Sequence, residues 1–172
     1  GNLLVAKNKV VPEIDKYFNL GSARSIVCVN AIRSNLQQRL NGCDYDSDFM
    51  LITNNPTLRD AAKRNYGSFL VPYCDVLPGG VVSYTTSPAD LSELDVKISE
   101  NKIGEIVNLA QFLNSLYWNE IAYGRSMDEV QWIYLDVCKL AVLSGMEIDT
   151  AKRMYAVDAG KVLRILKKPR DA

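Results

Sequence analysis

The chain has 172 residues, which is enough for one domain or two small ones with a hydrophobic core. Hydrophobic residues make up 48% and charged residues 23%, a normal mixture for a soluble globular protein. The 20 basic and 20 acidic side chains cancel, which argues against a free-standing nucleic-acid-binding domain, because such domains are usually basic. A segment of a larger nucleic-acid enzyme is not excluded.

The chain contains no histidine, so the commonest general base and the usual zinc ligand are both missing. The four cysteines have no zinc-type spacing and follow no signal peptide, so we expect reduced, mostly buried thiols and a cytoplasmic protein. No apolar run approaches the roughly 20 residues that a membrane span needs, so no membrane partner is expected. The abrupt start at Gly1 indicates a piece of a longer protein.

The first 60 residues are strand-like. Short apolar or β-branched runs predict strands at residues 3–6, 26–29 and 49–53. One or two helical turns are predicted for residues 12–18, because Pro12 stands at a tolerated first-turn position. A helix is predicted over residues 56–64, with Asn55 as its N-cap and Pro56 at its first position. Residues 67–97 are punctuated by proline and glycine and predict an extended linker.

From about Ser92 the hydrophobic period becomes helical. A helix beginning near residue 98 carries apolar residues on more than one face, which predicts burial against several neighbours, and it is expected to stop at Gly124. The pair Ser126 and Glu129 has capping-box spacing and predicts the start of a second helix, which should end near Gly145. A third, shorter helix is predicted over residues 150–166.

Three carboxylates, Asp44, Asp46 and Asp48, are spaced two apart beside an apolar run. Alternate residues of an extended segment point to the same side, so these side chains are expected to converge on a loop or strand end. Carboxylates that lie so close together repel one another, and a bound divalent cation offsets this repulsion. Mg²⁺ is the predicted cofactor, because it prefers carboxylate oxygens and keeps its other positions for water or substrate phosphates.

The spacing of the carboxylates does not fit a calcium loop, and the chain has no phosphate-binding loop. A calcium EF-hand loop requires Gly at its sixth position and Glu at its twelfth, where this chain has Phe49 and Asn55. A phosphate-cradling P-loop or dinucleotide fingerprint requires a glycine-rich turn that the chain lacks. Hard-metal chemistry on carboxylates therefore remains the strongest catalytic option.

The segment 41–50, NGCDYDSDFM, resembles the catalytic loop of the double-psi β-barrel RNA polymerases. That loop reads NADFDGD in the largest subunit of cellular polymerases, and GDxDGD in silencing-type RNA-directed RNA polymerases and related single-chain phage polymerases. Two later segments, Asn101 to Asn108 and Cys138 to Lys152, are similar in order and approximate spacing to further motifs of the silencing polymerases.

The resemblance implies an α+β fold: a partial double-psi β-barrel over residues 1–66, a linker over 67–97 and a helical region over 98–172. It implies nucleotidyl transfer, with Asp44, Asp46 and Asp48 as catalytic Mg²⁺ ligands. The implied partners are a nucleic-acid template, nucleoside triphosphates and the rest of the polymerase, including a second barrel. A helix from about Ser99 to Tyr123 would lie beside the active centre, in the place of the bridge helix. The isolated chain would hold half an active centre and be inactive.

Arg39 and Lys152 are candidate contacts for nucleic-acid phosphates, with solvated surface bases as the alternative. Two residues depart from the family: Ser47 replaces a glycine, and Leu143 replaces a histidine. Two rival functions stay open. One is a non-catalytic scaffold or degenerate polymerase relative. The other is an unrelated Mg²⁺-dependent phosphoryl-transfer enzyme, which would need further acidic ligands from Asp95, Glu105 and Asp149.

Overall fold

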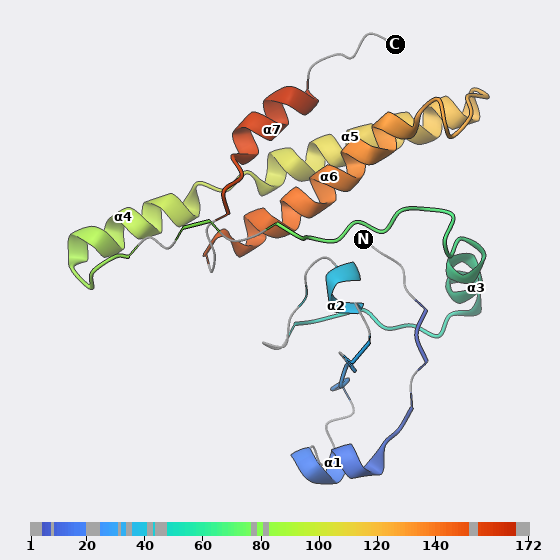
Figure 1. The fold of residues 1–172 in the computed structure, drawn as a ribbon, viewed down its shortest axis with the longest axis horizontal. Coiled ribbons are helices and arrows are strands. Elements are labelled where there is room, and N and C mark those ends of the chain that lie inside the picture. Colours follow the sequence, from blue (N-terminus) through green and yellow to red (C-terminus); the bar gives the residue numbers. More distant parts are fainter. Residues whose placement is uncertain are drawn as a thin grey trace. The chain divides into compact units, whose positions relative to one another are not determined.

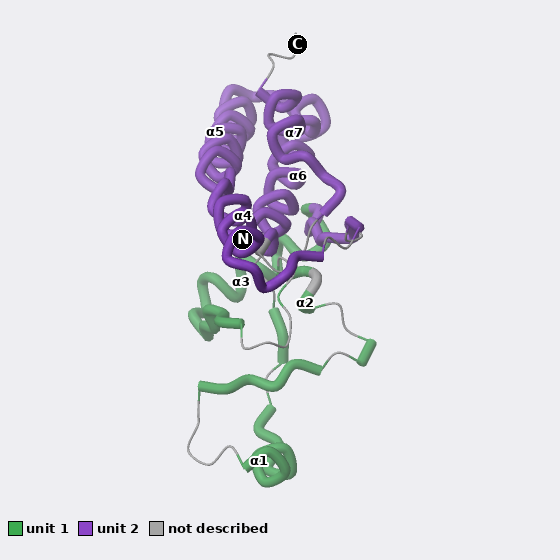
Figure 2. Tube along the Cα trace, turned by 90° about the vertical axis from the view of Figure 1, so that its left-hand side faces the viewer, with its two compact units in different colours: residues 1–69 green, residues 70–172 purple. Residues whose placement is uncertain are grey.

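The structure is a computed structural model in which the chain divides into two compact units, residues 1–69 and residues 70–172 (Figure 2). It describes residues 5–7, 9–19, 25–30, 32–33, 36–40, 43, 48–76, 79–80, 83–151 and 155–167, apart from the side chains of residues 38 and 151. The helices carry the labels of Figure 1.

The described part of the first unit consists of three helices and extended chain (Figure 1). The helices are α1 (Pro12–Phe18), α2 (Leu36–Arg39) and α3 (Pro56–Arg64). Helices α1 and α3 each begin with a proline, whose fixed φ suits the first helical turn. Both were predicted from this signal.

The predicted α+β fold with a partial double-psi β-barrel is wrong for the described residues, which are helical and contain no sheet. Residues 26–29 and 49–53, predicted as strands, belong to no helix or strand within the described chain. Phe49 is fully exposed and Leu51 is 94% exposed, so the run predicted as a buried strand has no apolar cover there. A local apolar pattern predicts extended backbone, whereas a sheet also needs a partner strand.

The second unit contains the helices that form the hydrophobic core. They are α4 (Pro88–Ser99), α5 (Ile103–Ala122), α6 (Gln131–Ile148), the 3₁₀ turn η1 (Asp149–Ala151) and α7 (Ala159–Leu166). Helices α5 and α6 lie side by side as a hairpin, and α7 packs against α6 (Figure 1). The short connection between α5 and α6 makes them antiparallel neighbours.

Helix α4 occupies a stretch that the sequence predicted mostly as extended linker. Pro88, one of the prolines that suggested a break, is instead part of the helix's start signal. Pro88 takes the first helical position, and the Oγ atom of Ser87 accepts a hydrogen bond of 3.2 Å from the backbone N–H of Asp90. The carboxylate of Asp90 in turn accepts bonds from the N–H and hydroxyl of Thr85, at 2.8 and 2.7 Å.

Helix α5 buries one face against α6. Ile106, Leu113 and Tyr117 recur at helical spacing and are at most 6% exposed, while Phe112 and Trp118 on other faces are 64% and 48% exposed. The prediction that several neighbours bury this helix is therefore wrong within the described chain. The predicted stop is confirmed: Gly124 has φ +93°, which glycine adopts without strain, and its N–H donates to the Ile121 carbonyl oxygen at 3.0 Å.

Helix α6 supplies the other side of the core. The predicted capping box forms, because Glu129 Oε2 accepts from the N–H of Ser126 at 2.7 Å, but the helix itself begins only at Gln131. Its predicted end at Gly145 is wrong. The helix continues to Ile148, and Met146, the residue directly after Gly145, is 5% exposed.

The core of the second unit is made by apolar residues of α5, α6 and α7. Its buried members are Ile106, Leu113, Tyr117, Val130, Ile133, Leu140, Leu143, Ala159, Leu163 and Leu166. One carboxylate, Asp136, is buried among the described residues and accepts a bond of 2.8 Å from Lys139 Nζ. A buried charge is tolerated when it is paired in this way. No helix in the described part of the chain has the length and apolar character needed to cross a membrane.

Candidate functional site

The structure describes only one residue of the aspartate triplet. Asp44 and Asp46 lie outside the described residues, as does Ser47. Asp48 is described: it is exposed and directly precedes Phe49. The convergence of the three carboxylates therefore stays a prediction. Asp48 is accessible to a solvated cation, and its carboxylate oxygens are of the type that Mg²⁺ prefers.

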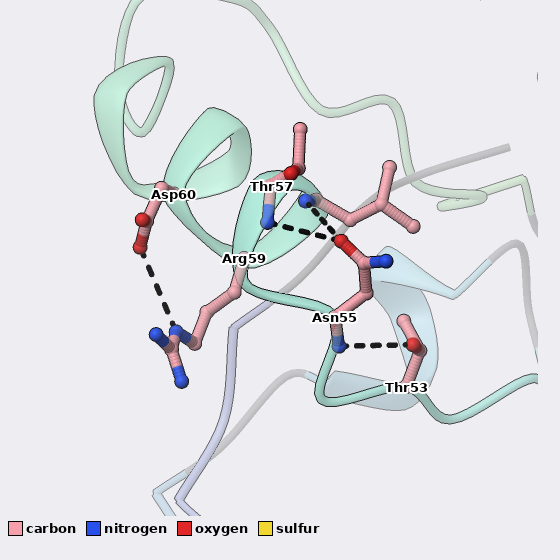
Figure 3. Close-up of polar contacts among 6 residues, drawn as sticks. Thr53, Asn55, Thr57, Arg59 and Asp60 are labelled. Atoms are coloured by element: carbon pink, nitrogen blue, oxygen red, sulfur yellow. Dashed lines mark hydrogen bonds and ion pairs between the residues drawn. The ribbon is translucent and has the colours of Figure 1, made fainter.

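Residues 53–60 anchor the chain just after the triplet (Figure 3). The Oδ1 atom of Asn55 accepts hydrogen bonds from the backbone N–H groups of Thr57 and Leu58, at 3.0 and 3.3 Å. Thr53 Oγ1 accepts from the N–H of Asn55 at 3.1 Å. The predicted cap on α3 is thus confirmed, and it fixes the direction of the chain a short distance beyond Asp48.

Of the two predicted phosphate contacts, the structure describes Arg39 alone, and both contacts stay predictions. The guanidinium of Arg39 lies over the ring of Tyr66, with its Cζ atom 5.7 Å from the ring centroid. This cation–π contact joins α2 to the chain after α3 and gives Arg39 a structural role within the first unit. Lys152 lies outside the described residues, so its role stays a prediction.

The two later segments of the resemblance meet in the structure. The first segment spans the start of α5, and the second covers most of α6 and its end. The backbone N–H of Lys102, the N-cap residue of α5, donates a hydrogen bond of 2.6 Å to Glu147 Oε1 on α6. The Glu147 carboxylate thereby satisfies a helix N-terminus that has no side-chain cap of its own. Neither hydrophobic period nor spacing revealed this contact between residues 45 apart.

Two hollows adjoin this contact. One, of about 360 Å³, has Leu143, Met146 and Ala159 among its apolar lining residues and Lys102 and Glu147 among its charged ones. The other, of about 340 Å³, lies between the start of α5 and helix α7. Both include Lys102, Asp158 and Gly160 in their walls. The open end of the helical hairpin therefore carries two hollows with charged residues in their walls.

Hydrogen bonds, with smaller contributions from nearby cations, lower the pKa of two carboxyl groups in these walls. A hydrogen bond from Lys167 Nζ to Glu105 Oε2, 2.8 Å long, is the main cause of the lowered pKa of Glu105. For Asp158, the main cause of the lowered pKa is the bond of 3.0 Å that its Oδ1 atom accepts from the backbone N–H of Lys161, with a smaller contribution from the Lys161 charge. Both carboxylates are consequently ionised at neutral pH.

The middle of α6 offers neither a thiolate nor a phenolate at neutral pH. Burial raises the pKa of Tyr134 to about 12, and the hydroxyl group donates a bond of 2.7 Å to the carbonyl oxygen of Leu70. Burial also raises the pKa of the Cys138 thiol. The four cysteines form no disulfide bond among themselves, but the prediction that they are mostly buried is wrong, since Cys28 is exposed and the others are partly exposed.

The acidic residues of the phosphoryl-transfer hypothesis are spread over three elements. Asp95 lies on α4, Glu105 on α5 and Asp149 in η1. Within the described ranges, no three or more Cys, Asp or Glu side chains are grouped to hold a metal ion. Glu105 is moreover held by Lys167.

Comparison with protein families, with curated proteins and with solved structures finds no match for this chain.

We expect replacement of Glu147 by alanine to lower the free energy of unfolding by about 1–3 kcal/mol, because the backbone N–H group of Lys102, the N-cap residue of α5, loses a charged acceptor. Chemical unfolding monitored by circular dichroism measures the change. Glu93→Ala is the matched control: Glu93 is exposed on α4, and its loss should cost less than about 0.5 kcal/mol. Equal stability of the Glu147 and Glu93 variants would show that the bond across the hairpin contributes nothing.

Proposed function

We propose that this chain is the metal-bearing segment, with the following helical region, of a templated RNA polymerase that performs nucleotidyl transfer. The observation that carries the proposal is the hydrogen bond between Lys102 and Glu147. Two segments that resemble separate polymerase motifs are distant in the sequence, yet they meet at one end of the α5–α6 hairpin. The short turn between α5 and α6 brings the two segments together, and a shared location is what a common functional centre requires.

In this proposal Asp44, Asp46 and Asp48 hold Mg²⁺. When bound, the metal would lower the pKa of the attacking 3′-hydroxyl group and stabilise charge on the phosphoryl oxygens. The chain's own contribution is to keep three carboxylates close and accessible, and the exposure of Asp48 supports that role. The absence of histidine is compatible with it, because activation by a metal needs no imidazole base.

A metal titration tests the proposed ligands directly. The isolated chain is expected to bind Mn²⁺ weakly, because the nucleotide phosphates that complete the coordination shell are missing. We expect Asp46→Asn to weaken binding by about ten-fold or more, measured by water-proton relaxation, since one charged ligand is lost. Asp95→Asn, on the exposed surface of α4, is the control and should leave binding unchanged. Equal binding by the parent and the Asp46 variant would contradict a shared site.

A second candidate function is a non-catalytic scaffold derived from such a polymerase. The observation that favours it is the distribution of burial. None of the described residues of 1–69 is buried, while the core residues all lie in 70–172. In this alternative the helical unit, residues 70–172, contributes to the assembly of a larger complex. The aspartate triplet then has no catalytic role. The scaffold is distinguished from the polymerase by the first experiment of the Discussion.

A further inference from the structure

The hollow between the start of α5 and helix α7 has an excess of positive charge. Its charged lining residues are the cations Lys102, Arg164 and Lys167 and the carboxylates Glu105 and Asp158. Each carboxylate already has a basic partner. Lys167 Nζ lies 2.8 Å from Glu105 Oε2, and Lys161 Nζ lies 3.8 Å from Asp158 Oδ2. Asp158 is also engaged as the N-cap of α7.

Two cations of the hollow have no direct counter-ion among the described residues. Neither Lys102 nor Arg164 forms an ion pair within 4.0 Å in that part of the chain. The charge of Lys102 is the smallest contribution to the lowered pKa of Glu105, and the charge of Arg164 is the smallest contribution to the lowered pKa of Asp158. The hollow is thus suited to a small anion with several acceptor oxygens.

The first turn of α7 lies close against the Lys102 side chain, which fixes where that cation stands in the hollow. Gly160 has no side chain, and a Cβ atom built there would lie 3.2 Å from Asp158 Oδ1 and 3.4 Å from Lys102 Cε. The Lys102 side chain therefore crosses close to the α7 backbone. Any larger residue at position 160 would occupy space beside the Lys102 stem.

We propose that this hollow binds a phosphate group through Lys102 and Arg164. The phosphate chemistry follows from the charges of the hollow alone. The class of ligand, a nucleotide or a nucleic-acid backbone, rests on the proposed polymerase function. Because the cations are solvent-accessible, binding is weak and falls as salt concentration rises.

Binding is measured on the 172-residue chain at low ionic strength, with a chelator present so that the aspartate triplet takes no part. The probes are inorganic pyrophosphate, followed by phosphorus NMR, and a labelled oligouridylate of about 12 nucleotides, followed by fluorescence anisotropy. Lys102→Gln and Arg164→Gln are each expected to raise the dissociation constant about three- to five-fold. The matched control is Arg125→Gln, which removes one positive charge beyond the opposite end of α5. This substitution should change the dissociation constant less than about 1.5-fold.

Pyrophosphate binding alone would assign the site to free phosphate compounds, and oligouridylate binding alone would assign it to a nucleic-acid backbone; either result supports the proposal. Equal weakening by all three substitutions, or no binding of either probe by the parent, overturns it. If the Lys102→Gln variant loses its helical circular dichroism signal, the Lys102→Arg variant is used in its place. The Lys102→Arg variant should retain binding of the probes. Because no metal is present, a negative result here leaves the metal-site proposal untouched.

Discussion

Replacing Asp48 by alanine is expected to abolish Mg²⁺-dependent incorporation of ribonucleotides on a template by the complete polymerase. The expected loss is about 10³-fold or more, equivalent to several kcal/mol, because transition-state charge on the phosphoryl oxygens loses part of its counter-charge. The fold is expected to survive. Asp48 is exposed, and neighbouring anions repel one another without metal, so removing one does not destabilise the apo protein. Incorporation of labelled nucleotide and circular dichroism measure the two effects.

The matched control for this experiment is Asp60→Ala. Asp60 is also an exposed carboxylate of the first unit, and it makes only a loose surface pair of 3.6 Å with Arg59 on the same helix (Figure 3). Its loss should leave incorporation within about two-fold of the parent. If the folded parent makes no RNA with any template and metal, the scaffold function is correct. If the Asp48 variant loses its fold, the carboxylate is structural.

The second large effect is expected in the hydrophobic core. Replacing Leu140 by alanine should lower the free energy of unfolding by about 2–5 kcal/mol, because a fully buried side chain on α6 leaves a cavity. That loss is a large fraction of the total stability of a small domain, typically about 5–15 kcal/mol. Urea unfolding followed by helical circular dichroism gives the difference.

Ile165→Ala is the control for the core substitution. Ile165 is 60% exposed on α7, so truncating it should cost less than about 0.5 kcal/mol. A small effect at Leu140 would mean that α5, α6 and α7 do not pack around this side chain. The comparison uses two apolar side chains of equal composition in the same unit, and therefore isolates burial from chemistry.

Local signals in the sequence predicted the local features. Asn55 and Pro56 predicted the start of α3, and Gly124 predicted the end of α5. Each of these residues acts on the backbone within one helical turn of its own position. Gly145 shows the limit of such signals. Helix α6 continues past this glycine to Ile148, and Met146, which directly follows Gly145, is 5% exposed.

Features that depend on distant residues were not predictable in this way. The apolar run from Phe49 predicted a buried strand, but burial depends on a partner that the run itself does not specify. The contact of Lys102 with Glu147 also escaped prediction, because no periodicity links a helix start to another helix end. Of the candidate site, the sequence supplied the aspartate pattern and the two later segments. The hollow and its excess of cations needed the structure.

The contact of Lys102 with Glu147 also has a kinetic consequence. The turn between α5 and α6 brings nearby residues together first, because closing a short loop costs less chain entropy than closing a long one. At the open end of the hairpin, the bond joins two residues that are 45 apart along the chain. We therefore expect this end to close last. Interactions that form after the transition state govern the unfolding rate rather than the folding rate. We therefore expect the bond of Glu147 to slow the unfolding of the hairpin and to have little influence on its folding rate.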